Sequence, residues 1–262
     1  MNNIERHVLT KNIEGIRQCR LNGEDINYLN KSGNPALYVH VINNLDGSKK
    51  ILDELLKFPN IDLNVRNLSF QYTPLFMALY DRKYDIAEYL MEKGADINVK
   101  DKIGNNILMS LLLKEDEKGV NFLLSHKQFS KLYINDENMD GNTALFYAIR
   151  RDLKAICEKL IEKGADILHE SKNGNSVINS LVQNDKLAHF IVDKVDKKDE
   201  IDNFCILIDK MSDIYNSEKN DNKFIKLTDS INLIKSIAYS YRLHNNLKEE
   251  LITKRNVKVL KL

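Results

Sequence analysis

Residues 69–98 read SFQYTPLFMALYDRKYDIAEYLMEKGADIN, and residues 139–168 read MDGNTALFYAIRRDLKAICEKLIEKGADIL. Both stretches run T-(P/A)-L-F-x-A, continue with a helical pattern, and reach E-K-G-A-D-I at the same internal spacing. A unit that recurs within one chain is typical of a stack of supersecondary units, because each copy buries its apolar face against its neighbours. The repetition therefore favours a binding surface over a single catalytic domain.

Weaker copies of this unit lie before, between and after the two clear ones. Copies align on the residue that precedes the first helix, which is Gly33, Gln71, Gly104, Gly141 or Gly174. These positions are 38, 33, 37 and 33 residues apart, and the longer intervals carry small insertions at residues 46–49 and 128–131. Residues 12–27 resemble the second half of the unit. We therefore expect an N-terminal copy that lacks its opening turn.

The clearest copy shows how each unit would fold. Thr73 can cap the first helix by accepting a hydrogen bond from an unpaired amide, and Pro74 suits the first helical position. Apolar residues then recur at helical spacing on one face of each of two helices. These residues are Leu75, Ala78 and Leu79 on the first helix, and Ile86, Ala87 and Leu90 on the second.

The end of the second helix is also marked in the sequence. Gly94 stands where a helix ends, a position that favours left-handed backbone. Asp96 and Asn98 follow, and both residue types suit the turn into an extended hairpin.

These motifs resemble the ankyrin repeat family. Residues 73–78, TPLFMA, match the T-P-L-H-x-A signature, with Phe in place of His. Residues 94–98, GADIN, and residues 164–167, GADI, match the G-A-D-(I/V)-N signature. The resemblance covers roughly residues 5–195. It implies an all-α solenoid over residues 1–195, built from about five to six helix-turn-helix repeats with short hairpin loops.

Three copies depart from the signature. In the first, Pro35 occupies the Thr position, and in the third, residues 106–108, NIL, replace T-P-L. In that third copy, Gly119 also stands where the outer helix would carry an aliphatic side chain. In the fifth, the outer helix looks shortened.

The C-terminal part, residues 196–262, carries neither signature but has two helical apolar stripes joined by a polar linker. We interpret it as a degenerate last repeat with a helical cap, because the end of a solenoid needs a polar outer face. The alternative is a helical module that recruits a partner.

Composition agrees with one elongated domain. The chain has 262 residues, of which 43% are hydrophobic and 29% charged, with a net charge of +1. Near-neutral charge argues against general binding of nucleic acid or membranes. Cys19, Cys157 and Cys205 are widely spaced and odd in number, as expected of reduced thiols inside a cell. With no apolar leader and no run of transmembrane length, we expect a cytoplasmic location, or host cytoplasm for a secreted effector.

The sequence contains few signs of a catalytic or metal-binding site. The six histidines are scattered, and no H-E-x-x-H, zinc-spaced Cys/His pair, phosphate-binding loop or G-x-S-x-G motif is present. We predict no catalytic residue, metal or cofactor. His40 is expected to be packed or partly exposed. Tyr38, Phe76 and Phe146 occupy the family's His position and are expected to pack rather than bind.

The resemblance implies a partner-binding face formed by hairpin tips and the exposed ends of the inner helices. The candidate residues, mapped position by position, are Phe70, Tyr72, Tyr80, Asp81, Lys102, Asn105, Leu113, Lys114, Met139, Asn142, Arg150 and Arg151. Several are apolar where such repeats usually face water, and aromatic residues beside arginine are typical of interface hot spots. The alternative is that Phe70 packs under a lengthened loop and the arginines are simply solvated.

These observations predict a non-enzymatic, monomeric protein that binds another protein through rigid shape and charge complementarity. The partner could be a host protein, if the chain is a bacterial effector or viral factor. It could instead be a toxin that a cytoplasmic immunity protein neutralises. A remote alternative is an enzyme with its active site in residues 196–262, where Cys205 and His244 are the only candidates.

Overall fold

The computed structural model describes residues 3–43, 49–127 and 132–167, together with residues 169, 171, 177, 236 and 239. Within these residues the regular structure is helical, apart from isolated bridges that pair Leu29 with Pro35 and Lys100 with Asn106. The helices are α1 (Asn3–Leu9), α2 (Ile13–Leu21), α3 (Ala36–Asn43), α4 (Lys50–Leu55), α5 (Pro74–Tyr80), α6 (Tyr84–Glu92), α7 (Ile107–Leu113), α8 (Glu117–Ser125), α9 (Ala144–Arg150) and α10 (Lys154–Glu162).

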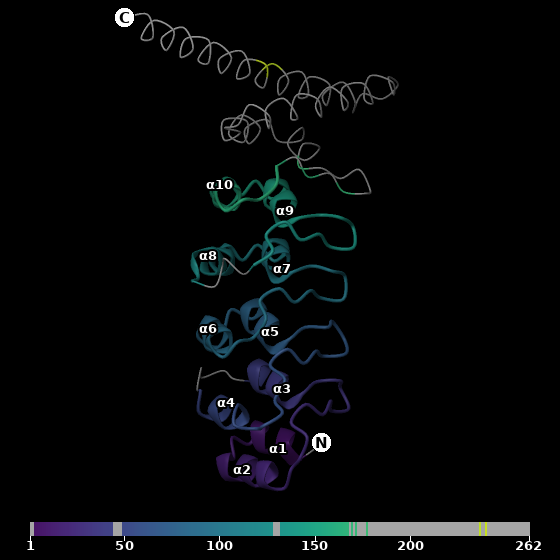
Figure 1. Ribbon diagram of the computed structural model, residues 1–262, viewed down its shortest axis with the longest axis vertical. Helices are drawn as coiled ribbons and strands as arrows, with labels where there is room; N and C mark the ends of the chain where they lie inside the picture. The colour runs from purple at the N-terminus through teal and green to yellow at the C-terminus, as the bar shows by residue number, and fades with distance from the viewer. Residues whose placement is uncertain are drawn as a thin grey trace, which may run out of the picture. The chain divides into compact units, whose positions relative to one another are not determined.

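The chain divides into two compact units, residues 1–139 and residues 140–262. In the first unit, α1, α3, α5 and α7 form an inner row in which each helix contacts the next. The outer helices α2, α4, α6 and α8 each pack on the inner helix that precedes them, and the hairpin loops lie on the opposite side of the inner row (Figure 1). This arrangement confirms the predicted all-α solenoid. In the second unit, α9 packs against α10.

The boundary predicted at residues 195 and 196, the shortened outer helix of the fifth copy and the proposed C-terminal capping helices all lie outside the described residues. The N-terminal copy, which precedes the one with Gly33, has two helices, α1 and α2, and Asn12 caps α2 by accepting from Gly15 N at 2.9 Å.

Three helices of the inner type, α5, α7 and α9, begin at side-chain caps, as predicted for Thr73. The Thr73 hydroxyl accepts a hydrogen bond from Phe76 N at 3.2 Å, and Pro74 occupies the first turn. Thr143 does the same for Phe146 N at 3.4 Å. In the third copy, the Asn106 side chain accepts from Met109 N at 3.0 Å. Asn therefore replaces Thr without loss of the cap, because both present an oxygen at the right distance.

Left-handed residues confirm the alignment of the copies. Gly33, Gly104 and Gly141 have φ angles of 72°, 81° and 76°, and Gln71, which stands in the same position of the second copy, has a φ of 61°. Gly94, where α6 ends, has a φ of 95°, as predicted. The sequence spacing therefore located the same turn in four successive hairpins.

Backbone hydrogen bonds tie each hairpin tip to the next. Leu68 N donates to Gly33 O at 2.9 Å, Lys102 N donates to Phe70 O at 2.9 Å, and Met139 N donates to Ile103 O at 3.1 Å. Because every bond crosses from one repeat to its neighbour, the tips of the first unit form a continuous edge.

The D-x-N sequence that opens the first three hairpins also links neighbouring repeats. Asp96 Oδ1 accepts from Asn98 N at 2.8 Å, which is the expected turn. In addition, Asn64 Oδ1 accepts from Asp96 N in the next repeat at 2.8 Å, and Asn98 Oδ1 accepts from Tyr133 N at 2.8 Å. These asparagines therefore bridge neighbouring repeats, a role that sequence analysis did not predict.

The core lies between the two helical rows. Leu79 and Leu90 have no exposed surface, and the predicted packing of Tyr38, Phe76 and Phe146 is confirmed, since each is buried. His40 is buried too. Cys19 and Cys157 are buried thiols, and burial is the main cause that raises their pKa values to about 11 and about 12. Both are therefore poor nucleophiles at neutral pH.

Two glycines with left-handed backbone allow the cost of an unfavourable φ angle to be measured separately from the cost of a steric clash. We expect Gly94→Ala to lower the free energy of unfolding by about 1 kcal/mol, because a Cβ there meets nothing within 4 Å and only the φ angle is unfavourable. We expect Gly104→Ala to cost about 2–3 kcal/mol, because its Cβ would also lie 2.9 Å from Met139 N, a backbone atom. Urea denaturation of the two variants tests this, and equal losses would contradict the close approach of the tips.

Candidate protein-binding surface

An aromatic run crosses the second repeat from its hairpin tip to the C-terminal end of α5. The ring of Phe70 stacks on that of Tyr72, with centroids 5.3 Å apart. Tyr72 stacks in turn on Phe76 at 4.4 Å and lies 5.5 Å from Tyr80 at a tilt. Phe76 is buried and anchors the group, whereas Phe70 is 58% exposed at the tip. The surface thus presents rigid aromatic rings on a packed base.

The next repeat adds a cation to this run. The ammonium group of Lys114, at the C-terminal end of α7, lies 3.8 Å from the centroid of the Tyr80 ring and donates a hydrogen bond to Tyr80 O. A lysine over an aromatic face is attracted by the negative charge density of the ring. Leu113, the preceding residue, is 37% exposed. Lys114 is therefore held against an aromatic ring of the preceding repeat.

Burial raises the pKa values of two phenols in and beneath this run. Desolvation is the main cause that raises the pKa of Tyr72 to about 12, and neighbouring Tyr80 and Asp101 raise it further. Burial, followed by the charge of Asp81, also raises the pKa of Tyr38. These hydroxyls therefore act as neutral hydrogen-bonding groups at physiological pH.

Lys83 stabilises the same surface, although it was not among the candidate residues. Its ammonium donates to Val41 O at 2.6 Å and Ile42 O at 2.8 Å, and lies 3.9 Å from the carboxylate of Asp81. Burial lowers its pKa, while Asp81 opposes that shift. Lys83 thereby donates to carbonyl groups at the C-terminal end of α3 and also forms an ion pair with Asp81. Nothing in the repeat signature identifies a lysine that reaches back to the preceding repeat.

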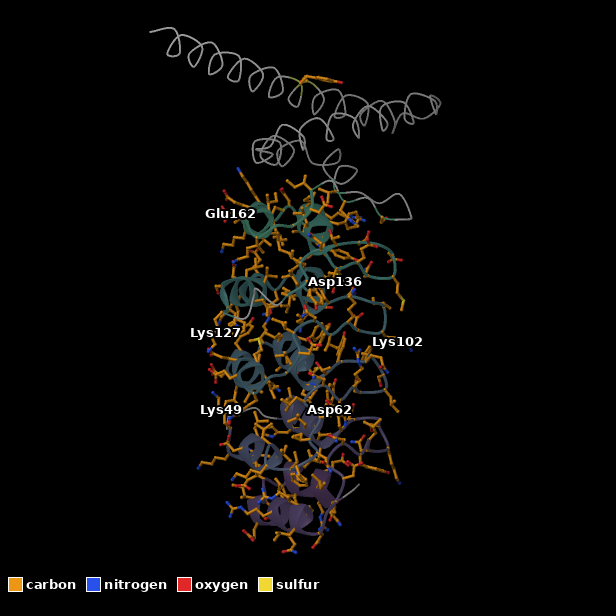
Figure 2. The ribbon with its side chains drawn as sticks, in the orientation of Figure 1. Lys49, Asp62, Lys102, Lys127, Asp136 and Glu162 are labelled. Carbon is orange, nitrogen blue, oxygen red and sulfur yellow. The ribbon has the colours of Figure 1, made fainter. Side chains whose placement is uncertain are left out.

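The hairpin edge exposes several large apolar side chains. Leu68, Phe70, Ile103 and Met139 have exposed fractions of 60%, 58%, 57% and 75%. Lys102, also predicted, lies on this edge, on the side of the molecule away from Lys49 and Lys127 (Figure 2). Leu68 was not among the candidate residues, since it precedes the repeated stretch that begins at residue 69.

Two candidate residues do not lie on the surface. Asn105 is 2% exposed, because its backbone N donates to Asp101 Oδ1 and its side-chain oxygen accepts from Asn138 Nδ2 of the next hairpin at 2.8 Å. Asn142 is 6% exposed, and its amide donates to the hydroxyl of Tyr147 at 3.4 Å. Both asparagines stabilise hairpins, so we remove them from the candidate surface.

The second unit carries the predicted arginines. Arg150 and Arg151 are exposed at the C-terminal end of α9. The guanidinium carbon of Arg150 lies 5.7 Å from the centroid of the Phe146 ring within the same helix. This contact again combines a cation with an aromatic ring.

The described part of the chain shows no metal-binding cluster and no membrane-spanning helix. Among its residues, no group of three His, Cys, Asp or Glu side chains is placed to hold a metal ion. Among its helices, none has the length and apolar character needed to cross a bilayer.

Comparison with known proteins bears on the family. A model described as ankyrin repeats, in three copies, matches residues 7–101, and an ankyrin repeat model matches residues 140–172. Residues 7–101 and 140–172 of this chain are therefore ankyrin repeats. Ankyrin repeats imply a protein–protein interaction module, which agrees with the exposed aromatic and cationic side chains described above.

Several relatives share the repeats. The chain is 26% identical over 160 residues to the nuclear factor NF-kappa-B p105 subunit of Gallus gallus, covering 60% of this chain and 16% of that protein. It is 31% identical over 152 residues to the ANK repeat-containing protein nipk-1 of Caenorhabditis elegans, covering 52% of this chain and 23% of that protein. It thus spans less than a quarter of either relative.

A solved structure has the same fold. It is described as the Bd0816 predatory endopeptidase from Bdellovibrio bacteriovorus in complex with immunity protein Bd3460. The likeness has a TM-score of 0.54 at 23% identity and covers 70% of this chain and 92% of that one. At this identity the comparison establishes the fold alone.

Proposed function

We propose that this ankyrin-repeat protein is a non-enzymatic binding protein that engages another protein through its hairpin edge and inner-helix ends. The observation that carries the proposal is the aromatic run of Phe70, Tyr72 and Tyr80, which is stacked, partly exposed and flanked by Lys114. Aromatic anchors on a rigid base lose little conformational freedom on binding, so they contribute strongly to affinity.

The contacts around this run support a preformed site. Phe76 fixes the Tyr72 ring from below, and Lys114 fixes the Tyr80 ring from the next repeat. Because each group is held by its neighbours before any partner arrives, little ordering is needed at binding. The exposed ends of the run would contact the partner first.

One alternative concerns the purpose of binding. Immunity protein Bd3460 occurs in a complex to which this fold is similar, so one candidate role is an antidote that covers a toxin. An effector or viral factor that binds a host protein would use the same surface. The identity of the captured partner separates the two: a hydrolase or other toxin encoded beside this chain supports the antidote, whereas a host protein supports the effector.

We expect the double variant Phe70→Ala with Tyr80→Ala to weaken binding of the native partner more than 10-fold, about 1.4 kcal/mol, without lowering the melting temperature. The partner is first captured on the wild-type chain from native cells, identified by mass spectrometry, purified, and titrated by calorimetry. Tyr133→Ala is the matched control, because Tyr133 is 65% exposed but lies outside the hairpin tips. Wild-type affinity in the double variant would refute the proposed surface.

A further inference from the structure

The hairpin edge of the first unit carries an apolar stripe that nothing in the described structure covers. Leu68 and Phe70 lie on one hairpin, Ile103 on the next, and Met139 on the one after, and each is more than half exposed. The backbone bonds between Phe70 O and Lys102 N and between Ile103 O and Met139 N fix these tips in sequence. A rigid, repeated apolar edge of this kind indicates an interaction site.

Beside the stripe, two lysines lack partners in the described part of the chain, whereas the nearby carboxylates have them. Lys31 and Lys102 are exposed on the first and third hairpins, and neither side chain forms an ion pair or hydrogen bond with any described residue. The nearby carboxylates of Asp101 and Asp136 already have hydrogen-bond or ion-pair partners within the structure. Asp101 Oδ1 accepts from Ile103 N at 2.9 Å and from Asn105 N at 2.8 Å, and Asp136 pairs with Lys100 at 3.2 Å. The first and third hairpins therefore each present an exposed lysine that has no partner among the described residues.

The spacing of the repeats limits what could span this edge. Packed helices lie about 8–10 Å apart, so Lys31 and Lys102, two repeats apart, are separated by roughly 16–20 Å along the stack. An extended chain advances about 3.3 Å per residue, so a segment of about five to six residues would reach from one lysine to the other. Its central side chains would lie against Leu68, Phe70 and Ile103.

We propose that the hairpin edge binds an extended segment of the partner protein that has apolar residues at its centre and acidic residues at its ends. The acidic residues would pair with Lys31 and Lys102, and the apolar residues would cover the stripe. This inference rests on the proposed function and adds the chemistry of the partner. Complementary charge at the rim steers association and selects among partners, while the apolar centre supplies affinity.

Two peptide display libraries test the charge requirement. Both have randomised apolar residues at the central positions, but one supplies Asp and Glu at the outer positions and the other supplies Lys and Arg. We expect the full-length wild-type chain to enrich the acidic library at least 10-fold over the basic one. The variant Lys31→Glu with Lys102→Glu should reverse that preference, and Ile103→Ala should reduce enrichment of the acidic library.

The matched control is Lys49→Glu with Lys127→Glu, which makes the same change in net charge at the opposite edge (Figure 2). It should keep the wild-type preference. Equal enrichment of both libraries, or the same preference in the Lys31 and Lys102 variant, would overturn the acidic segment while leaving the aromatic surface intact. Enrichment of neither library by the wild-type chain would overturn the hairpin edge as a peptide site. Failure of the proposed function itself would instead appear as partner binding that survives loss of Phe70 and Tyr80.

Discussion

Leu90→Asp is expected to lower the free energy of unfolding by at least about 4 kcal/mol, enough to unfold the first unit. Leu90 lies on α6 with no exposed surface, so the variant both removes an aliphatic side chain and introduces a carboxylate without a partner. Each effect alone is costly, because the cavity loses packing contacts and the charge loses its hydration. Urea denaturation followed by circular dichroism measures the change in the full chain.

Leu21→Asp is the control for this variant. Leu21 is also on an outer helix, α2, but its side chain is 76% exposed, so the same substitution should change stability by less than about 0.5 kcal/mol. Hydrogen exchange on the Leu90→Asp variant then shows which helices lose amide protection. In a stack, protection should be lost from α3 to α8, because each repeat is stabilised by its neighbours. Loss confined to residues 84–94 would contradict that dependence.

The sequence alone was sufficient to predict the fold because the repeat is a local pattern. Apolar spacing, the Thr73 cap and the left-handed turn at Gly94 all lie within one copy, and the structure confirms them. Even the imperfect copies could be aligned, since Gln71 adopts the left-handed turn that glycine makes elsewhere. Local signals of this kind need no knowledge of distant contacts.

The surface was harder to predict, because exposure depends on neighbouring repeats. Asn105 was expected at a tip, yet the side chain of Asn138 in the next hairpin binds it and removes it from water. Lys83, in contrast, was passed over, although it reaches back to carbonyl groups of α3. Both outcomes arise from hydrogen bonds between residues more than 30 positions apart in sequence. The repeat signature does not encode such contacts.

Gly119 shows how an apparent departure from the repeat can be compensated. The outer helix α8 was expected to carry an aliphatic residue there. In the structure, a Cβ at Gly119 would lie 2.9 Å from Asp116 Oδ2 and 3.1 Å from Leu111 Cδ2. The buried carboxylate of Asp116 therefore occupies the space that an aliphatic side chain would fill.

Asp116→Ala is expected to destabilise the first unit by about 3 kcal/mol. Asp116 is 3% exposed and caps α8 by accepting from Gly119 N at 3.3 Å, while its other oxygen accepts from the hydroxyl of Tyr84 at 3.0 Å and pairs with Arg82 at 3.2 Å. Alanine removes the cap and leaves the partly buried Tyr84 hydroxyl without its acceptor. Asp116→Asn should cost less, about 1–2 kcal/mol, because its single amide oxygen can still cap the helix, while its NH2 group faces the Tyr84 hydroxyl as a donor and the ion pair with Arg82 is lost.

The same geometry predicts that Asp116 and Gly119 are coupled. Gly119→Ala alone should destabilise the unit by about 1–2 kcal/mol, since the added methyl group collides with the carboxylate. In the Asp116→Ala background that collision is gone, and alanine is a better helix former than glycine by about 1 kcal/mol. The double variant should therefore be more stable than Asp116→Ala, and a double-mutant cycle by urea denaturation measures the coupling. Additive losses would mean that the carboxylate does not take the place of the missing side chain.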